Sequence, residues 1–316
     1  MRLDGARLTL RLYRFELIAF GAGLGGLVVA AFVAAAYVDS LKPGPECSLL
    51  DSASFECQRA LDAWNGAQGV LGGLLMSPLL LVTYAIGLFL GVPIVARELE
   101  RGTVRLAWSL APSRWRWYMA RMVPILVVLI ILTFAAGVAT DQFFAASRPG
   151  VDPSKSFDGY GTRGGLLASR ALFVFAVSVV VGSVIGRALP GVIIAALVAT
   201  IGLAGGIQVY QGILKTEAVA QPIDETGENG GFREGDMYLD SKFVLPDGTL
   251  VGWEYFGNIG NGPYDQEGNP VYPQVTLVIP GERYRFVEAR EALALAGGSL
   301  VALLLASFVV SRRRPG

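Results

Sequence analysis

The sequence predicts an all-α polytopic membrane protein. It has six transmembrane helices, an interfacial helix between the second and third, and a small β-containing extracellular cap between the fifth and sixth. Hydrophobic residues make up 53% of the 316 residues, charged residues only 16%, and the mean hydropathy is +0.51. Several apolar runs reach the roughly 20 residues with which a helix crosses a bilayer. Arginines gather in alternate segments between these runs, as they do in multi-pass proteins.

The six apolar runs must be helices, because backbone groups in hydrocarbon have to form their hydrogen bonds within the segment. They cover residues 17–38, 70–96, 122–140, 166–186, 188–209 and 292–310. The first run also has features of a cleaved signal peptide, since arginines precede it and small residues end it. Its 22 residues exceed the roughly 7 to 15 of such a segment, so we expect a retained span.

The arginines predict the orientation. An even number of spans places both termini on one side, and both ends of the chain are arginine-rich, which predicts cytoplasmic termini. Residues 97–121 hold six arginines against two glutamates and also fall inside. The outer segments are acidic, with two basic and five acidic residues in 39–69 and five and thirteen in 213–288. Residues 1–16 alternate arginine with Leu, Tyr and Phe, as either an interfacial helix or a solvated basic tail does.

The predicted cap covers residues 213–288 and carries a net charge of 5 − 13 = −8. Residues 242–253 read as a hairpin around Asp247 and Gly248, and 271–280 as a further strand. Sorting of a substrate and simple solvation both remain open for it. The organisation is therefore an N-terminal segment (1–16), five spans (17–212), the cap (213–288), and the sixth span with a basic tail (289–316).

Several kinds of chemistry are excluded or disfavoured. The chain has no histidine, which removes the Ser-His and Cys-His nucleophile arrangements. It also has no GxxxxGK[ST] segment, so it holds no nucleotide by a P-loop. Cys47 and Cys57 both lie in the first outer segment, where a disulfide is favoured; two thiols alone cannot fill a zinc shell. We expect no catalytic residue, metal or cofactor in this chain.

Glycines and a few charges stand within or beside the spans. Gly21 to Gly26, Gly202 to Gly206, Gly87 with Gly91, and Gly182 with Gly186 are candidate faces for close helix packing. Arg170 lies about one turn from the outer end of the fourth span and is expected to snorkel to the interface as an anchor. Glu288 and Glu291 precede the sixth span and are expected at the interface.

Residues 97–111 form the predicted interfacial helix, with one apolar face and Arg97, Arg101 and Arg105 at four-residue spacing on another. Glu98 can pair with Arg101 three residues on, and Gly102 weakens the middle of the helix by about 1 kcal/mol. Beyond it, Pro112 breaks the pattern and Ser113 is a candidate N-cap for the next helix. Trp115, Trp117 and Tyr118 are predicted anchors in the aromatic belt of the membrane interface. The helix either anchors the topology or carries a partner's movement into spans two and three.

The same stretch resembles the signature of ABC-2 type transporter permeases, particularly the actinobacterial type. The signature stands here as Arg97-Glu98-Leu99-Glu100-Arg101-Gly102-Thr103, continues through Arg105-Leu106-Ala107-Trp108, and reaches Ser113-Arg114. Residues 171–198 resemble the fourth and fifth spans of that group, and residues 280–292 resemble it more loosely.

The resemblance implies a transmembrane subunit of an ABC exporter in a bacterial cell membrane. Residues matching the family's coupling helix would dock on a separate ATP-binding subunit, present in two copies, which would bind ATP and Mg. The coupling positions implied are Arg97, Glu98, Glu100, Arg101, Gly102, Thr103 and Arg105. A second permease protomer, as a homodimer, and membrane lipid are the other expected partners; nucleic acid is not. The alternative is a membrane-anchored sensor or scaffold, with an acidic outer domain and no transport.

Overall fold

The computed structural model describes residues 9–44, 47, 54–110, 113–222, 233–259 and 271–313. The chain divides into two compact units. The first contains Met1–Pro149, Gly159–Leu203 and Glu288–Gly316, and the second contains Gly150–Asp158 and Ala204–Val287.

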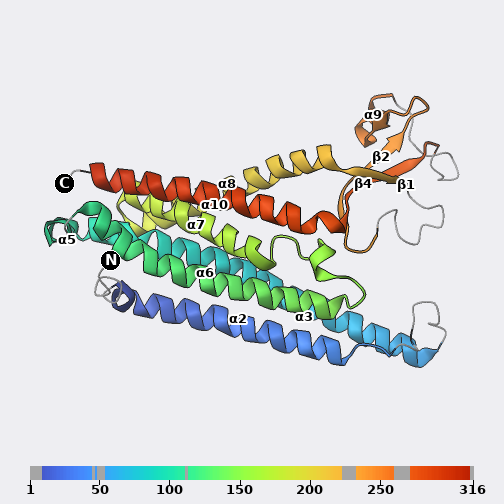
Figure 1. The fold of residues 1–316 in the computed structure, drawn as a ribbon, viewed down its shortest axis with the longest axis horizontal. Helices are drawn as coiled ribbons and strands as arrows, with labels where there is room; N and C mark the ends of the chain where they lie inside the picture. The colour runs from blue at the N-terminus through green and yellow to red at the C-terminus, as the bar shows by residue number, and fades with distance from the viewer. Residues whose placement is uncertain are drawn as a thin grey trace. The chain divides into compact units, whose positions relative to one another are not determined.

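Six helices in the described residues are long and apolar enough to cross a membrane, which confirms the all-α polytopic class (Figure 1). They are α2 (Arg14–Ser40), α3 (Phe55–Gly91) continued by α4 (Pro93–Glu100), α6 (Arg114–Ser147), α7 (Gly164–Ile185), α8 (Ala188–Glu217), and α10 (Tyr284–Arg312) with the short η2 (Gly281–Arg283) before it. Most of these helices extend beyond the apolar runs, because a helix continues until a cap or a breaker ends it and not where hydrocarbon ends. The predicted cap at Ser113 is confirmed: its hydroxyl accepts a hydrogen bond from the Arg116 backbone amide at 3.2 Å.

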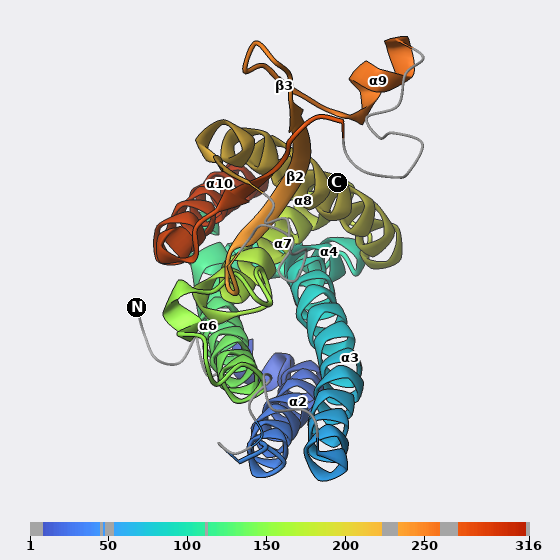
Figure 2. The ribbon, with the colours of Figure 1, turned by 90° about the vertical axis from the view of Figure 1, so that its right-hand side faces the viewer.

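In the first unit, α2 packs against α6 and α3, and α7 packs against α3 and α6 (Figures 1 and 2). The close approach of α3 to α7 depends on glycine. A Cβ atom added at Gly91 would lie 2.6 Å from the Ser178 Cβ, and one at Gly87 would lie 2.9 Å from a Val174 methyl. The predicted packing role is therefore confirmed for Gly87 and Gly91. Around Gly21 to Gly26 an added Cβ would meet no atom within 4 Å.

The segment between the first two spans contains the predicted disulfide. Cys47 and Cys57 are bonded, and their Cα atoms lie 5.3 Å apart. The bond ties residue 47 to the first turn of α3, where the Ser54 hydroxyl accepts a hydrogen bond from the Cys57 backbone amide.

The second unit contains a four-stranded antiparallel sheet in the order β1-β4-β2-β3. Its strands are β1 (Val219–Pro222), β2 (Met237–Val244), β3 (Leu250–Val251) and β4 (Gln274–Ile279). The predicted hairpin around Asp247 and Gly248 and the predicted later strand are both present. A short helix, α9 (Trp253–Ile259), follows β3.

Part of the segment between α6 and α7 belongs to this unit, which the prediction of a 213–288 cap missed. The segment includes a 3-10 turn, η1 (Pro153–Lys155). The Phe157 amide donates to the Gly235 carbonyl at 2.8 Å, and the Phe157 ring meets Tyr284 edge to face. The contribution of 150–158 depends on these long-range contacts, so no local sequence pattern indicates it.

Candidate coupling site

The coupling segment, residues 93–110, is two short helices and not the single helix predicted for 97–111. The first, α4, ends at Glu100, and the second, α5, covers Val104–Leu110. Between them Gly102 has φ +68°, a left-handed conformation that glycine adopts without the cost other residues pay, and which ends helices. The weak point predicted at Gly102 is thus a complete break. Pro112 lies outside the described residues.

The beginning of α4 is buried. Pro93 occupies the first turn, where a missing amide hydrogen is tolerated, and Ile94, Val95 and Ala96 are at most 1% exposed. This part of α4 packs against α7. The first helix of the coupling segment, α4, is therefore a partly buried continuation of the second span.

Glu98 joins the coupling segment to α6. Its carboxylate accepts a hydrogen bond from the Arg121 guanidinium at 2.7 Å and another from the Thr103 hydroxyl at 2.7 Å. The predicted pairing with Arg101 is therefore wrong. Arg101 caps the end of α4 beside the left-handed turn, while Arg121 comes from the facing helix.

Arg97 joins the coupling segment to α2 through an ion pair of 2.5 Å with Glu16. Just before α2, the Tyr13 hydroxyl donates to the Pro93 carbonyl at 3.3 Å, and the Thr9 hydroxyl donates to the Ala120 carbonyl at 3.2 Å. Residues 1–8 of the predicted interfacial N-terminal helix lie outside the described residues. Residues 9–16 therefore contact the coupling segment and α6.

Glu100 joins the coupling segment to α8. Its Oε2 accepts a hydrogen bond of 3.0 Å from the backbone amide of Ala188, the first residue of that helix. A carboxylate is stabilised at a helix N-terminus, where amides lack helical acceptors and the dipole is positive. Glu100 is thus an end cap for the fifth span.

Two arginines donate hydrogen bonds to carbonyls at the C-terminal ends of helices. Arg114, which begins α6, donates to the carbonyls of Ser311 and Arg313 at 2.8 and 2.9 Å. Arg313 in turn donates to the carbonyls of Ser183 and Val184 at the end of α7. Cations are favoured at these C-terminal carbonyls. The ends of all six spans that lie on this side are thereby linked through the coupling segment and its neighbours.

The three predicted aromatic anchors differ in their exposure. Trp115 is 46% exposed, as an interface residue would be, but Trp117 is 7% exposed and Tyr118 is fully buried. The Tyr118 hydroxyl donates to the Leu303 carbonyl of α10 at 3.1 Å, and Trp117 meets Trp108 of α5 edge to face. An anchoring role for Trp117 and Tyr118 is therefore corrected to helix packing, since a helix rotates about 100° per residue and turns them to its inner side.

The outer face of the coupling segment is open. Arg101, Gly102, Thr103, Leu106 and Ser109 are exposed, and Leu106 keeps 64% of its surface accessible. The side chain of Arg105 lies outside what the structure describes. The turn at 101–103 and the residues Leu106 and Ser109 of α5 are therefore accessible to another molecule.

A comparison with known protein families finds a match. Residues 19–210, about three-fifths of the chain, match the family described as ABC-2 membrane transporter related. The chain belongs to that family. It is a transporter permease and a multi-pass membrane protein, and its family implies an ABC transporter system. A search of the curated proteins and a search of the solved structures each find no match.

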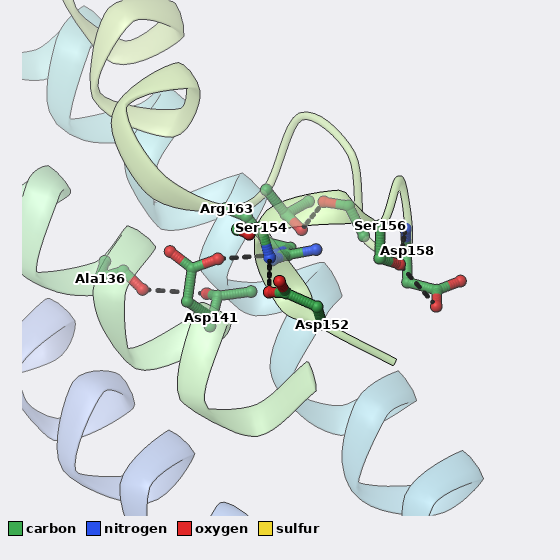
Figure 3. A network of polar contacts seen from close by, with 10 residues as sticks. Ala136, Asp141, Asp152, Ser154, Ser156, Asp158 and Arg163 are labelled. Carbon is green, nitrogen blue, oxygen red and sulfur yellow. Dashed lines mark hydrogen bonds and ion pairs between the residues drawn. The ribbon is translucent and has the colours of Figure 1, made fainter. Parts of the chain in front are cut away.

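At the other end of its bundle the permease contains ion pairs that the sequence did not indicate. Arg163, 2% exposed, donates from Nε to Asp141 at 2.7 Å (Figure 3). Arg170 pairs with Glu291 at 2.7 Å, and the Tyr160 hydroxyl donates to the same carboxylate at 2.6 Å. The snorkelling predicted for Arg170 is therefore corrected to a helix-to-helix ion pair. Glu288 and Glu291 are both buried within the protein, each 7% exposed.

Proposed function

We propose that the permease is the transmembrane subunit of an ABC exporter, moves a substrate outward, and is driven by a separate ATP-binding subunit that docks on the coupling segment. Two permease protomers form a homodimer and two ATP-binding subunits bind ATP and Mg beneath them. Both termini and the coupling segment face the cytoplasm of a bacterial cell, in agreement with the arginine distribution.

The observation that carries the proposal is the two-sided character of the coupling segment. Its inner side is tied to the spans through Arg97, Glu98 and Glu100. Its outer side presents Arg101 and Leu106 to the surroundings. A docking segment needs both an inner side tied to the spans and an outer side that a partner can reach, and the coupling segment has both.

The proposed mechanism is a shift between two states of the membrane part. ATP draws the two ATP-binding subunits together, and the docked tips follow them. Because the coupling segment continues α3 and is bonded to α6, its displacement changes the inclination of these two spans. The ATP-binding subunits bias the spans only to the extent that they bind the two states with different affinity.

The motif residues divide into two groups under this proposal. Arg97, Glu98 and Glu100 position the coupling segment from within, while Arg101, Gly102 and Thr103 form its exposed turn. Substitution of Glu98 or Glu100 therefore tests how the coupling segment is positioned against the spans. Docking of the ATP-binding subunit is tested by substitutions on the exposed side of the segment.

The experiment is a pull-down of tagged permease in mild detergent, with mass spectrometry of what is retained. Leu106→Glu and Arg101→Glu are compared with Val271→Glu, an exposed apolar position in the cap unit (56% exposed). We expect wild type and the control to retain a P-loop ATPase, and the two coupling-segment variants to lose retention about tenfold, equivalent to ~1.4 kcal/mol of binding free energy.

Two results would contradict the proposal. Undiminished retention by both coupling-segment variants would place docking elsewhere. A wild-type permease that retains no ATPase, under conditions that preserve a known transporter complex, would favour the sensor or scaffold alternative.

A further inference from the structure

A stripe of residues on the second span faces α8. Residues at four-residue spacing lie on one side of a helix, and five such residues continue from α3 into α4: Tyr84, Leu88, Val92, Ala96 and Glu100. Leu88, Val92 and Ala96 are buried in one cluster with Val174 and Val181 of α7 and with Ala195 and Ala199 of α8. The contacts of residues 84 to 100 with residues 188 to 200 are called the seam here.

The two ends of the seam are polar. At one end the Tyr84 hydroxyl lies 2.6 Å from the Ala196 carbonyl and 2.7 Å from the Thr200 hydroxyl. At the other end Glu100 accepts from the Ala188 amide at 3.0 Å. Between them Gly191 lies against Val92, since a Cβ added at Gly191 would lie 2.8 Å from a Val92 methyl.

The remaining faces of α8 in the first unit are open within this chain. Its exposed large apolar residues include Leu189, Ile193, Leu197 and Ile201, each at least 57% accessible. In the first unit α8 is therefore held by the seam, by Phe173 of α7 beside Gly202, and by the turn before it. Arg313 fixes that turn from the other side through the Ser183 and Val184 carbonyls.

We propose that Glu100 is a positioning residue that makes the fifth span follow the coupling segment. Because Glu100 is the last residue of α4 and bonds to the first amide of α8, a displacement of the coupling tip pulls directly on the cytoplasmic end of α8. The spans that receive the movement are then not only the two that flank the segment in sequence, α3 and α6, but also α8. This inference rests on the proposed function.

The experiment measures the movement of α8 and of α6 separately. Single cysteines replace Leu189, 73% exposed at the start of α8, or Trp115, 46% exposed at the start of α6. The native cysteines are disulfide-bonded and do not react with maleimide. Maleimide labelling rates are compared with and without ATP plus vanadate, in the complete complex with its ATPase in lipid nanodiscs.

Four variants are compared in each probe background. Glu100→Ala removes the acceptor, and Ala188→Pro removes the donor at a helix position where proline is tolerated. Glu100→Gln keeps an acceptor oxygen and serves as the rescue. Asp62→Asn, an exposed carboxylate on α3, is the control for loss of charge.

We expect Glu100→Ala and Ala188→Pro to retain the ATPase and the ATP response at position 115, while the response at position 189 falls at least threefold. Glu100→Gln restores most of that response. An unchanged response at position 189 in Glu100→Ala would overturn the inference, and so would an equal loss in Glu100→Gln. A wild-type complex that retains no ATPase, or in which neither probe responds to ATP, contradicts the proposed function itself.

Discussion

Glu98 and Arg121 form an ion pair of 2.7 Å that joins α4 to α6 across 23 residues of sequence, with side chains 20% and 13% exposed. Such partly buried, charge-assisted pairs stabilise more than exposed ones, on the order of 1.5 to 3 kcal/mol. The pair therefore fixes the angle between the coupling segment and the third span.

The first prediction concerns this pair. Glu98→Ala should lower the free energy of unfolding by about 2 kcal/mol, because the Arg121 charge then loses its carboxylate in a site with little water. The measurement is a double-mutant cycle of Glu98→Ala and Arg121→Ala by denaturant titration in mixed micelles. A coupling energy above about 1 kcal/mol is expected; additive effects of the two substitutions would refute a direct interaction.

The second prediction compares two glycines that share the same spacing motif. Gly91→Ala should destabilise the permease by about 1 to 3 kcal/mol, because the new methyl group would lie 2.6 Å from the Ser178 Cβ and 2.8 Å from the Phe175 carbonyl oxygen. Gly25→Ala is the matched control, since nothing lies within 4 Å of its added Cβ. Both are measured by thermal unfolding in detergent. Equal shifts in Tm would show that α3 and α7 are not in close contact.

The parts of the fold that the sequence predicted are those that neighbouring residues determine. An apolar run of sufficient length specifies a span by itself, and Asp247-Gly248 specifies a tight turn between two strands. The Cys47–Cys57 disulfide belongs to the same class, because the two residues are close in sequence. Each of these features was predicted and is present.

The parts that were not predicted depend on partners distant in sequence. Glu98 has Arg101 three residues away, yet it pairs with Arg121 because the left-handed turn at Gly102 ends α4 there. Glu100 was assigned to docking from its place in the motif, whereas its bond is to Ala188. Aromatic residues near a span end suggested anchors, but burial of Trp117 and Tyr118 depends on which face α10 and α5 cover. Such choices follow from the packing of whole helices.

The third prediction concerns the pH dependence of the cap unit. Burial opposes ionisation of Asp240, but its contacts with Lys242 at 3.3 Å and Lys215 at 3.4 Å outweigh this and lower the pKa of Asp240 below its usual value. The stabilisation is therefore present above the unfolded pKa of about 4, and is lost as the pH falls through the lower folded value.

Asp240→Asn tests this direction of the pH dependence. At pH 7 it should destabilise the cap unit by about 0.5 kcal/mol, as expected for a pair that is partly exposed, and near pH 2 it should match wild type. The measurement is hydrogen exchange of the β2 and β4 amides at both pH values, with Asp62→Asn as the control. A difference between wild type and Asp240→Asn that grows as the pH falls would contradict the assignment.

The fourth prediction concerns the pair of Asp141 and Arg163, in which the guanidinium is 2% exposed and the carboxylate side chain 32%. Because Arg163 precedes α7 and Asp141 lies in α6, the pair fixes one helix end against its neighbour (Figure 3). Asp141→Asn should cost about 2 kcal/mol, since the buried cation loses a charged acceptor. Thr140→Val is the neighbouring control, because the Thr140 hydroxyl bonds only within its own helix, to the Ala136 carbonyl at 2.9 Å. Unfolding in mixed micelles measures both variants. If they destabilise equally, the ion pair is no stronger than a local hydroxyl bond, and the junction of α6 and α7 is held by packing alone.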